Sequence, residues 1–388
     1  MRSRIPGILF LFILFCIGVA AWFSLPHRAI QTRKLALTPV SLTGLPGWSS
    51  SDSRAALAAF RRSCGAISKL PASTGLGAYA GHAGDWFSVC RTAFAANENA
   101  ARSFFERHFQ AFQVGGDALV TGYYEPLLHG SRTRHGVFQT PVYAPPRDLV
   151  SVDLGAFRSE WKGERIAGTI SGQRLVPYAT RAEIDEYPPP ASVLFYGDDP
   201  VAVFFLHIQG SGRVALDDGA TVRVAYAAQN GRPYSAIGGR LIHLGVLTRE
   251  TLSMQSIRAW LKENSSAARQ VMETNQSYVF FKEGPVGDAS LGSAGTEGVA
   301  LTPGASIAID PKFHALGVPM FVATRMPNGQ MLQSLFVAQD TGGAIRGPAR
   351  IDIFFGFGAH AEALAGRMQA AGRLYVVLPN QLAQGVAQ

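Results

Sequence analysis

The 388-residue chain lacks the compact motifs that hold a metal ion or a nucleotide phosphate, and it is poor in cysteine and in charge. It contains no CxxC, HExxH, GxxxxGK[ST] or GxSxG sequence, and its 9 histidines are scattered without metal-ligand spacing. A metal enzyme is therefore disfavoured, and no cofactor is expected. Charged residues make up only 16% of the chain, against about 25% in a typical globular protein.

The charge that is present is mostly basic, with a formal net charge of +8 and an isoelectric point near 9.6. A basic chain suits an anionic partner such as a nucleic acid, a membrane surface or an acidic polymer. No run of about five to eight Lys and Arg residues occurs, which argues against a nucleic acid.

The N-terminus carries an export signal. Arg2 and Arg4 precede an apolar run from about Ile8 to Phe23, which predicts a signal peptide or an uncleaved anchor over residues 1–25. We expect an exported, periplasmic protein that meets a membrane only through this segment, at the inner membrane or associated with the outer one. Residues 26–50 contain Pro, Ser and Thr, and they predict an irregular linker.

Cysteine is scarce, with three residues in the chain. Cys16 lies in the apolar run behind Phe15, which is too bulky for a lipoprotein cleavage site. Cys64 and Cys90 remain, an even pair in an exported chain, and the pair predicts a disulfide. The alternative is two buried free thiols.

Three amphipathic helices are predicted between Ser51 and Phe112. Ser51 or Asp52 could cap the first and Asp85 the second. Both cysteines fall on apolar faces, so a disulfide would join the first two helices. The three faces are Leu57, Phe60, Cys64 and Ile67; Trp86, Val89, Cys90 and Phe94; and Ala101, Phe104, Phe105, His108, Phe109 and Phe112.

From Val120 onward the pattern changes to short strands between Gly and Pro turns. Asp218 and Gly219 predict a hairpin turn. The pattern favours a mainly β fold with N-terminal helices, built from β-barrels rather than a doubly wound sheet. The predicted strands are VTGYYEPLL, GVFQTPVYAPP, RLVPYAT, SVLFYG, VAVFFLHIQGSGRVAL, YVFFKE, SIAIDP, PMFVATRM, QSLFVAQD, ARIDIFF and LYVVLP, with helices at SMQSIRAWLKENS and AHAEALAGRMQAAG.

Two short motifs suggest other chemistries. Residues 356–361, GFGAHA, match a dinucleotide-binding pattern, but the next strand ends without the acidic residue that a ribose needs. Asp340-Thr341-Gly342 matches the triplet of aspartic proteases. That chemistry needs two carboxylates sharing a proton, and only a homodimer could supply the second triplet here.

Three aspartates form the positive signal. Asp310 ends SIAID, Asp340 ends FVAQD, and Asp352 stands between isoleucines in ARIDIFF. Asp310 precedes a proline, and a turn-forming role is as good an interpretation there as a catalytic one. Asp352 is different because an apolar environment raises a carboxyl pKa, which is what a general acid requires.

These residues resemble a known family. A strand aspartate, then DTGGAIRG, then IDIFFG is similar to the three-aspartate "3D" signature. Upstream, TGYYEPLLHGSRTRHGVFQTPVY, HIQGSGRV, YAAQNGRPYSAIGGRLI and SMQSIRAWL resemble the membrane-bound lytic transglycosylase A family of Gram-negative bacteria. The matches are in order and cover roughly residues 121–379. The lipobox of the lipoprotein members is absent.

The resemblance implies a double-psi β-barrel domain over residues 51–127 plus 276–388, with the 3D region at about 301–379. It implies an inserted β-rich domain over 128–275 and a glycan groove between the two. The implied activity is that of a peptidoglycan lytic exotransglycosylase, a lyase. It cleaves the β-1,4 bond between N-acetylmuramic acid and N-acetylglucosamine and leaves a 1,6-anhydro ring. The implied partners are glycan strands, and cell-wall synthesis complexes are a further expectation.

Carried over by position, Asp352 is expected to be the catalytic acid and base, Asp340 to support it, and Asp310 to be mainly structural. At the tyrosine pair, successive strand residues face opposite ways, so one ring is expected to remain available for stacking on a sugar or a peptide. The residues expected to bind substrate are Tyr123, Tyr124, Gln209, Ser211, Gly212, Arg213, Asn230 and Tyr234.

Two alternatives remain at this point. In the first, Asp340 and Asp352 are the base and acid of an inverting hydrolase on the same fold. In the second, the chain is a non-catalytic protein that binds the cell wall. An aspartate inside an apolar strand favours an enzyme, because a binding protein has no need of it.

Overall fold

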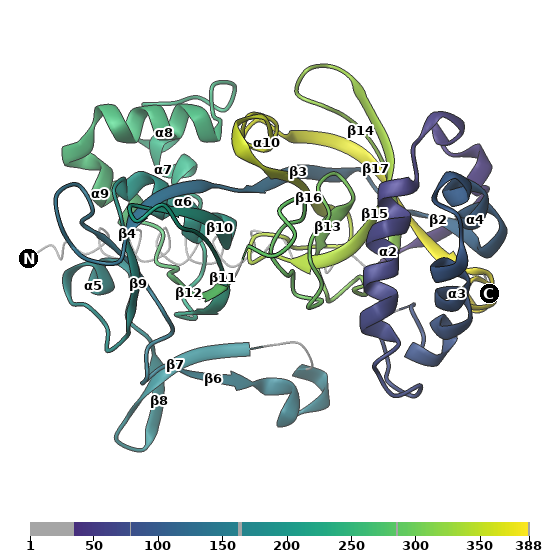
Figure 1. Ribbon diagram of the computed structural model, residues 1–388, viewed down its shortest axis with the longest axis horizontal. Helices are drawn as coiled ribbons and strands as arrows, with labels where there is room; N and C mark the ends of the chain where they lie inside the picture. The colour runs from purple at the N-terminus through teal and green to yellow at the C-terminus, as the bar shows by residue number, and fades with distance from the viewer. Residues whose placement is uncertain (1–34, 78, 162–164, 285, 387–388) are drawn as a thin grey trace, which may run out of the picture. The chain divides into compact units, whose positions relative to one another are not determined.

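The computed structural model describes residues 35–77, 79–161, 165–284 and 286–386 (Figure 1). The predicted signal or anchor segment and the first part of the predicted linker lie outside these residues. Within the described ranges, no helix combines the length and hydropathy needed to cross a bilayer.

Six strands close into a barrel. The six strands follow one another from β17 (Gln369–Pro379) to β3 (Ala118–Glu125). These two end strands also pair antiparallel with each other, which closes the ring. β13 and β15 are parallel, as are β3 and β16, and the remaining pairs are antiparallel. The structure has the mainly β barrel that the sequence predicts. In ring order the strands are β17 (Gln369–Pro379), β14 (Pro319–Arg325), β15 (Met331–Thr341), β13 (Ser306–Ile309), β16 (Arg350–Phe357) and β3 (Ala118–Glu125).

The prediction of an irregular linker up to residue 50 is wrong for its described part. β1 (Leu37–Val40) pairs with β2 (Phe109–Val114), which in turn pairs with β17, so both strands extend the barrel sheet. Trp48 is 1% exposed, packs on Phe321 and donates its indole N–H to Glu106 at 2.8 Å. The segment is ordered because Leu42, Leu45 and Trp48 are buried in the main apolar core.

Three helices pack beside the barrel: α2 (Arg54–Ile67), α3 (Ala83–Ala95) and α4 (Ala101–His108). α2 lies along β15, as Figure 1 shows. The third helix ends at His108, and the chain continues as β2. The prediction that Phe109 and Phe112 extend its helical face is therefore wrong, although both side chains are buried.

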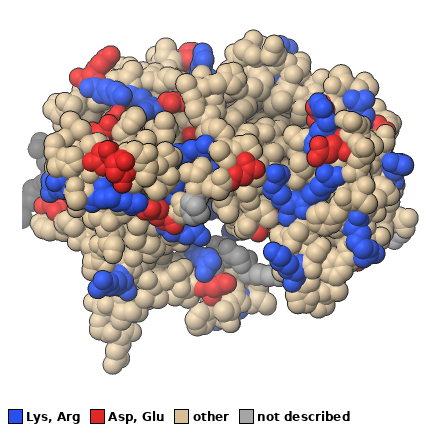
Figure 2. Space-filling view, viewed as in Figure 1, with Lys and Arg blue, Asp and Glu red and all other residues tan. Residues whose placement is uncertain are grey.

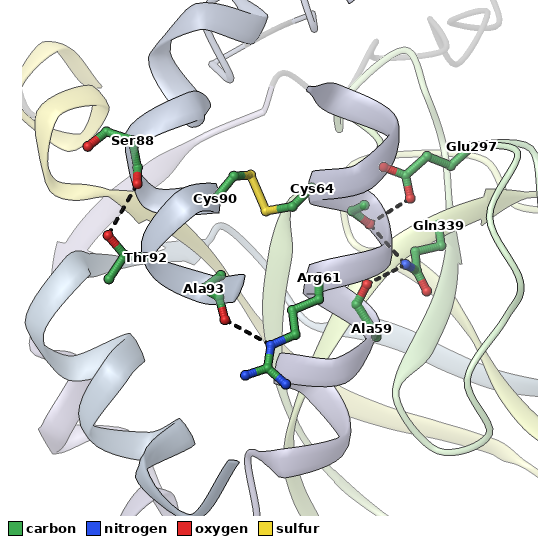
Figure 3. Close-up of a disulfide and its surroundings, with 10 residues drawn as sticks. Ala59, Arg61, Cys64, Ser88, Cys90, Thr92, Ala93, Glu297 and Gln339 are labelled. Carbon is green, nitrogen blue, oxygen red and sulfur yellow. Dashed lines mark hydrogen bonds between the residues drawn. A yellow bond between two sulfur atoms is a disulfide. The ribbon is translucent and has the colours of Figure 1, made fainter. Parts of the chain in front are cut away.

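Cys64 of α2 and Cys90 of α3 form a disulfide across a sequence separation of 26 residues (Figure 3). Both cysteines are buried in the main apolar core. The disulfide links α3 covalently to α2, and α2 in turn contacts strand β15 of the barrel.

Replacing both cysteines by serine should lower the free energy of unfolding by about 3 kcal/mol, since a loop of this length loses that much chain entropy when it is closed. Chemical denaturation of the double variant and of the oxidised wild type would measure the difference. Equal stability of the two proteins would show that the bond does not constrain the unfolded chain.

The insert domain is a second sheet with its own apolar core, which contains Leu128, Val214 and Phe281. Its boundaries are wider than the predicted 128–275. The first strand of the insert starts at Leu127, and Val279–Gly284 pairs with the insert rather than with the barrel. The strand order is β12 (Val279–Gly284), β11 (Thr221–Gln229), β10 (Ser211–Leu216), β4 (Leu127–Ser131), β9 (Val193–Gly197) and β5 (Thr140–Tyr143). The predicted hairpin at Asp218-Gly219 joins β10 and β11.

One predicted strand of the insert is a helix. Residues Pro200–Gln209 form α6, which Asp199 caps by accepting hydrogen bonds from the N–H groups of Val201 and Ala202. Pro200 occupies the first turn, and Gly210 ends the helix in the left-handed conformation with φ 79°. The helix is buried on most sides, so its sequence has no polar face to reveal a helical period.

The remaining elements surround these sheets. A separate three-stranded sheet consists of β6 (Val150–Asp153), β7 (Arg165–Ser171) and β8 (Arg174–Pro177). The other helices are α5 (Arg181–Glu186), α7 (Ile237–His243), α8 (Met254–Glu263), α9 (Ser265–Glu273), α10 (Gly358–Ala365) and α11 (Asn380–Val386), with 3-10 turns at Leu42–Gly44, Trp48–Ser50, Glu98–Ala100, Leu154–Ala156 and Ser159–Trp161.

Candidate active site

Asp352 lies on β16, between β13 and β3. Its neighbours Ile351 and Ile353 point into the barrel core, and Asp352 points to the opposite face, where it is half-buried. Thr121, its partner in register on β3, donates its hydroxyl to Asp352 Oδ1 at 2.5 Å. Arg350 Nη1 donates to Thr121 Oγ1 at 2.8 Å. The arginine therefore orients the threonine hydroxyl, and the threonine orients the carboxyl.

Burial raises the pKa of Asp352 to about 6. The Thr121 hydroxyl and the Arg350 charge oppose this shift, and the charge of Asp340 adds to it. The carboxyl is thus a proton donor over a pH range in which an exposed aspartate is ionised. A partly accessible acid with a raised pKa is suited to general acid chemistry.

Asp340 is the last residue but one of β15, and both of its carboxyl oxygens accept hydrogen bonds. Oδ1 accepts the backbone N–H and the hydroxyl of Thr296, at 2.9 and 3.0 Å. Oδ2 accepts the hydroxyl of Tyr123 at 2.9 Å. Burial raises the pKa of Asp340, and these donors lower it, because they stabilise the carboxylate form.

Asp310 is 2% exposed, and its carboxyl accepts hydrogen bonds from backbone N–H groups. Its Oδ1 accepts the N–H of Lys312 at 3.1 Å, and its Oδ2 accepts the N–H of Gly347 at 2.7 Å. Gly347 lies in the loop that joins Asp340 to Asp352. Asp310 therefore holds that loop against the turn after β13.

The prediction that one tyrosine of the pair is free to stack on a sugar is wrong. Tyr123 is 8% exposed and packs on Phe354, while Tyr124 is 1% exposed and packs against α10. The two rings do face opposite ways, but β3 is covered on both faces. Tyr123 serves the site through its hydroxyl on Asp340.

The QGSGR segment supports β3 and the strand end that follows the tyrosines. Gln209 Oε1 accepts the N–H of Tyr124 at 3.0 Å, and Ser211 donates to Glu125 at 3.4 Å. A side chain at Gly212 would meet Leu206 at 2.7 Å, so close packing requires glycine there. Arg213 lies 3.4 Å from Glu125 and stacks over the ring of Phe357 at 3.6 Å.

The two residues expected from the NGRPY segment differ in their exposure. Asn230 is fully buried, and it donates to the carbonyls of Ala179 and Gln276. It is a structural residue, and its prediction as a substrate ligand is wrong. The ring of Tyr234 is 39% exposed. Burial and then the charge of Asp352 raise the pKa of Tyr234, so its hydroxyl lies within electrostatic reach of the acid.

Two domain models match the chain: the MltA specific insert domain over residues 119–282 and the 3D domain over residues 305–378. A solved membrane-bound lytic murein transglycosylase from Agrobacterium tumefaciens superimposes with a TM-score of 0.80 at 32% identity. That match covers 90% of this chain and 99% of the other. The chain belongs to the membrane-bound lytic murein transglycosylase A family.

Two further members place the chain within this transglycosylase family. The Escherichia coli K12 membrane-bound lytic murein transglycosylase A is 34% identical over 271 residues, which span 68% of this chain and 66% of that protein. A structure of E. coli MltA with bound chitohexaose has a TM-score of 0.62 at 26% identity, covering 90% of this chain and 93% of that one.

Sequence reasoning missed three polar residues of this candidate site: Thr121, Glu125 and Thr296. Thr121 and Glu125 both lie in the TGYYEP segment, on either side of GYY. Their place in this motif was the signal that could have identified them. Thr296 had none, because it lies 44 residues from Asp340 in a loop of ordinary composition.

Among the described residues of this family member, no group of three or more His, Cys, Asp or Glu side chains could hold a metal ion. Basic side chains occur in several separate groups on the face shown in Figure 2, with acidic ones between them. That face has no continuous basic stripe of the kind that binds a nucleic acid backbone.

Proposed function

We propose that the protein is a lytic transglycosylase that cleaves the β-1,4 bond between N-acetylmuramic acid and N-acetylglucosamine of peptidoglycan. Asp352 is its single acid and base. The observation that carries the proposal is the half-buried Asp352 carboxyl with its raised pKa, oriented by Thr121 on a barrel strand. Membership of the transglycosylase family supports the reaction class.

The hydrogen bonds at Asp352 indicate which oxygen carries the proton. Because Arg350 donates to Thr121 Oγ1, the threonine hydrogen points to Asp352 Oδ1. Oδ1 thereby accepts this hydrogen bond, and we assign the acid proton to Oδ2. Oδ2 then donates this proton to the glycosidic oxygen as the bond to the muramic anomeric carbon breaks.

The same carboxylate then completes the reaction. The C6 hydroxyl of the muramic residue attacks the anomeric carbon, and Asp352 accepts its proton. This step closes the 1,6-anhydro ring and restores the acid without consuming water. The nucleophile is part of the substrate, so its effective molarity is high and no second carboxylate is required.

The bonds of Asp340 favour this reaction over inverting hydrolysis. A general base for water must take up a proton, and Asp340 already accepts two hydrogen bonds from Thr296 and one from Tyr123, which lower its pKa and make it a weaker base. Its negative charge raises the pKa of Asp352, which helps to keep the acid protonated. Asp340 therefore supports the acid rather than acting as its partner.

Glycan binding is supported by one relative and by the exposed tyrosine. The E. coli MltA structure holds chitohexaose, a β-1,4-linked oligosaccharide. Tyr234 is the most exposed of the three tyrosines expected to bind substrate, at 39%, and it lies within electrostatic reach of Asp352. We assign it to stacking on a sugar beside the scissile bond. The N-terminal apolar run supports a cell-envelope location for this reaction.

Mass spectrometry of the products from purified sacculi tests the proposal. Muropeptides with 1,6-anhydro ends, one water lighter than hydrolytic products, are the expected result. Reducing ends that contain the added water would overturn it in favour of a hydrolase. Binding of sacculi without any product would instead establish a wall-binding protein.

The rate should fall as pH rises through about 6, because Asp352 must be protonated to act. Thr121→Val should shift this alkaline limb to higher pH, since the lost hydroxyl stabilises the carboxylate and so lowers the pKa of Asp352. The pH profile of kcat on solubilised glycan strands would measure both effects. A limb at the same pH in the variant, or one that moves to lower pH, would contradict the assignment of Asp352 as the acid.

A further inference from the structure

The loop between β12 and β13 brings Thr296 to Asp340, and both hydrogen bonds to Asp340 Oδ1 come from this residue. The loop doubles back on itself, with a bridge between Ala294 and Ala300 and a bond from Gly295 N–H to the Val299 carbonyl at 3.0 Å. A side chain at Gly295 would meet the Gln339 carbonyl at 2.5 Å, so the loop lies directly against the end of β15.

Glu297, the next residue, ties this loop to both β15 and α2. Its backbone N–H donates to the Gln339 carbonyl at 3.1 Å. Its carboxyl accepts the hydroxyl of Ser63, on α2, at 2.7 Å. Ser63 also accepts the Gln339 amide at 2.9 Å, and that amide donates to the Ala59 carbonyl as well. Figure 3 shows Glu297 and Gln339 on one side of α2 and the disulfide to Cys90 on the other.

The hydrogen bonds of Ser63 connect α2 to Glu297 and Gln339, which are the chain neighbours of Thr296 and Asp340. Glu297 follows Thr296 in the chain, and Gln339 precedes Asp340. Ser63 and Gln339 are fully buried, so the network is shielded from water and its geometry is well defined. Ser63 also precedes Cys64, whose disulfide anchors α2 to α3.

We propose that Glu297 is a positioning residue for Asp340: held by Ser63 of α2, it places the Thr296 N–H and hydroxyl that bind Asp340 Oδ1. Its kinetic consequence rests on the proposed function. Released from Ser63, the Thr296 loop leaves Asp340 with weaker donors, so the charge beside Asp352 changes its position and its pKa.

Two substitutions of Glu297 separate positioning from bulk stability. Glu297→Ala removes the acceptor of the Ser63 hydroxyl. Glu297→Gln keeps an oxygen of the same shape for it. Burial raises the pKa of Glu297 to about 7, against the hydrogen bonds from Ser63 and Gln339, so a neutral amide is a close substitute for the acid. Ser63→Ala breaks the same bond from the helix side.

The control is Arg62→Met, on the residue next to Ser63. Arg62 Nη1 donates to Thr302 Oγ1 at 3.1 Å, so this variant also breaks a bond between α2 and the region between β12 and β13. It leaves Thr296 and Asp340 untouched.

The experiment measures kcat and KM on solubilised glycan strands and titrates the Asp340 carboxyl by carbon-13 NMR in each full-length variant. Glu297→Ala and Ser63→Ala should lower kcat about tenfold with KM within about twofold, because a catalytic group displaced by about 1 Å costs up to 100-fold. The pKa of Asp340 should rise in both, since the Thr296 donors lower it in the wild type. Glu297→Gln and Arg62→Met should match the wild type in both measurements.

An unchanged Asp340 pKa in Glu297→Ala and Ser63→Ala would overturn the inference, as would equal losses of kcat in these variants and Arg62→Met. Failure of Glu297→Ala to fold leaves the Ser63→Ala titration to decide. Wild-type protein that forms no anhydro product would overturn the proposed function alone, because the NMR titration requires no turnover.

Discussion

Asp352→Asn should abolish turnover of peptidoglycan, with kcat lowered on the order of 1,000-fold, because general acid–base catalysis contributes about 10²- to 10⁴-fold. The amide has the shape of the carboxyl and can still accept the Thr121 hydroxyl, so the fold and glycan binding should persist. Product release from sacculi measures the rate, and co-sedimentation with sacculi measures binding.

Asp117→Asn is the matched control for this variant, since Asp117 is exposed in the turn between β2 and β3. It should retain wild-type turnover. If Asp352→Asn kept a tenth or more of the wild-type rate, the proton donor would have to be another group. If the remaining products carried water and Asp340→Asn removed them, the hydrolytic pair would be the better mechanism.

Glu125→Gln should lower the free energy of unfolding by about 3 kcal/mol, because it leaves two largely buried guanidinium groups without their counter-charge. Glu125 is 0% exposed at the end of β3, 3.4 Å from Arg213 Nε and 3.7 Å from Arg223 Nε. It also accepts the Ser293 N–H at 2.5 Å. The carboxylate thus joins the barrel strand, the insert sheet and the loop after β12.

The same substitution at Glu283 is the control for this prediction. Glu283 pairs with Arg132, and both side chains are considerably more exposed, at 29% and 42%. An exposed pair contributes about 0 to 1 kcal/mol, so Glu283→Gln should be nearly neutral. Urea denaturation of both variants measures the contrast. Equal stabilities would show that the buried charges at Glu125 are compensated by other groups.

Much of the barrel could be predicted from the sequence. The strands that carry Asp340 and Asp352 are short apolar runs between turn residues, and local pattern is enough to locate such runs. The helix α2 has a clear apolar face, and Asp218-Gly219 selects a hairpin by its backbone preferences alone. These features depend on residues close together in the chain.

Sequence reasoning led to a wrong prediction where an element is buried on several sides, because such an element shows no alternation of apolar and polar residues. α6 has apolar residues around most of its surface, so its interior resembles a buried strand, and its Asp199 and Gly210 caps were the better signal. The same limit applies to the tyrosine pair. Alternation correctly predicts that Tyr123 and Tyr124 face opposite ways, but it does not show that α10 and Phe354 cover the two faces.

By itself, the sequence determined the class of fold, the export segment as a prediction, and the three aspartates with their spacing, because each depends on local composition or on residues near one another. Only the tertiary structure decided what each carboxyl does. The isoleucines beside Asp352 point away from it. Its environment comes from burial, from Thr121 on the neighbouring strand β3, and from Arg350 on its own strand, which donates to Thr121. A pKa depends on the groups that surround the carboxyl in space, and closure of the barrel brings those groups together from distant parts of the chain.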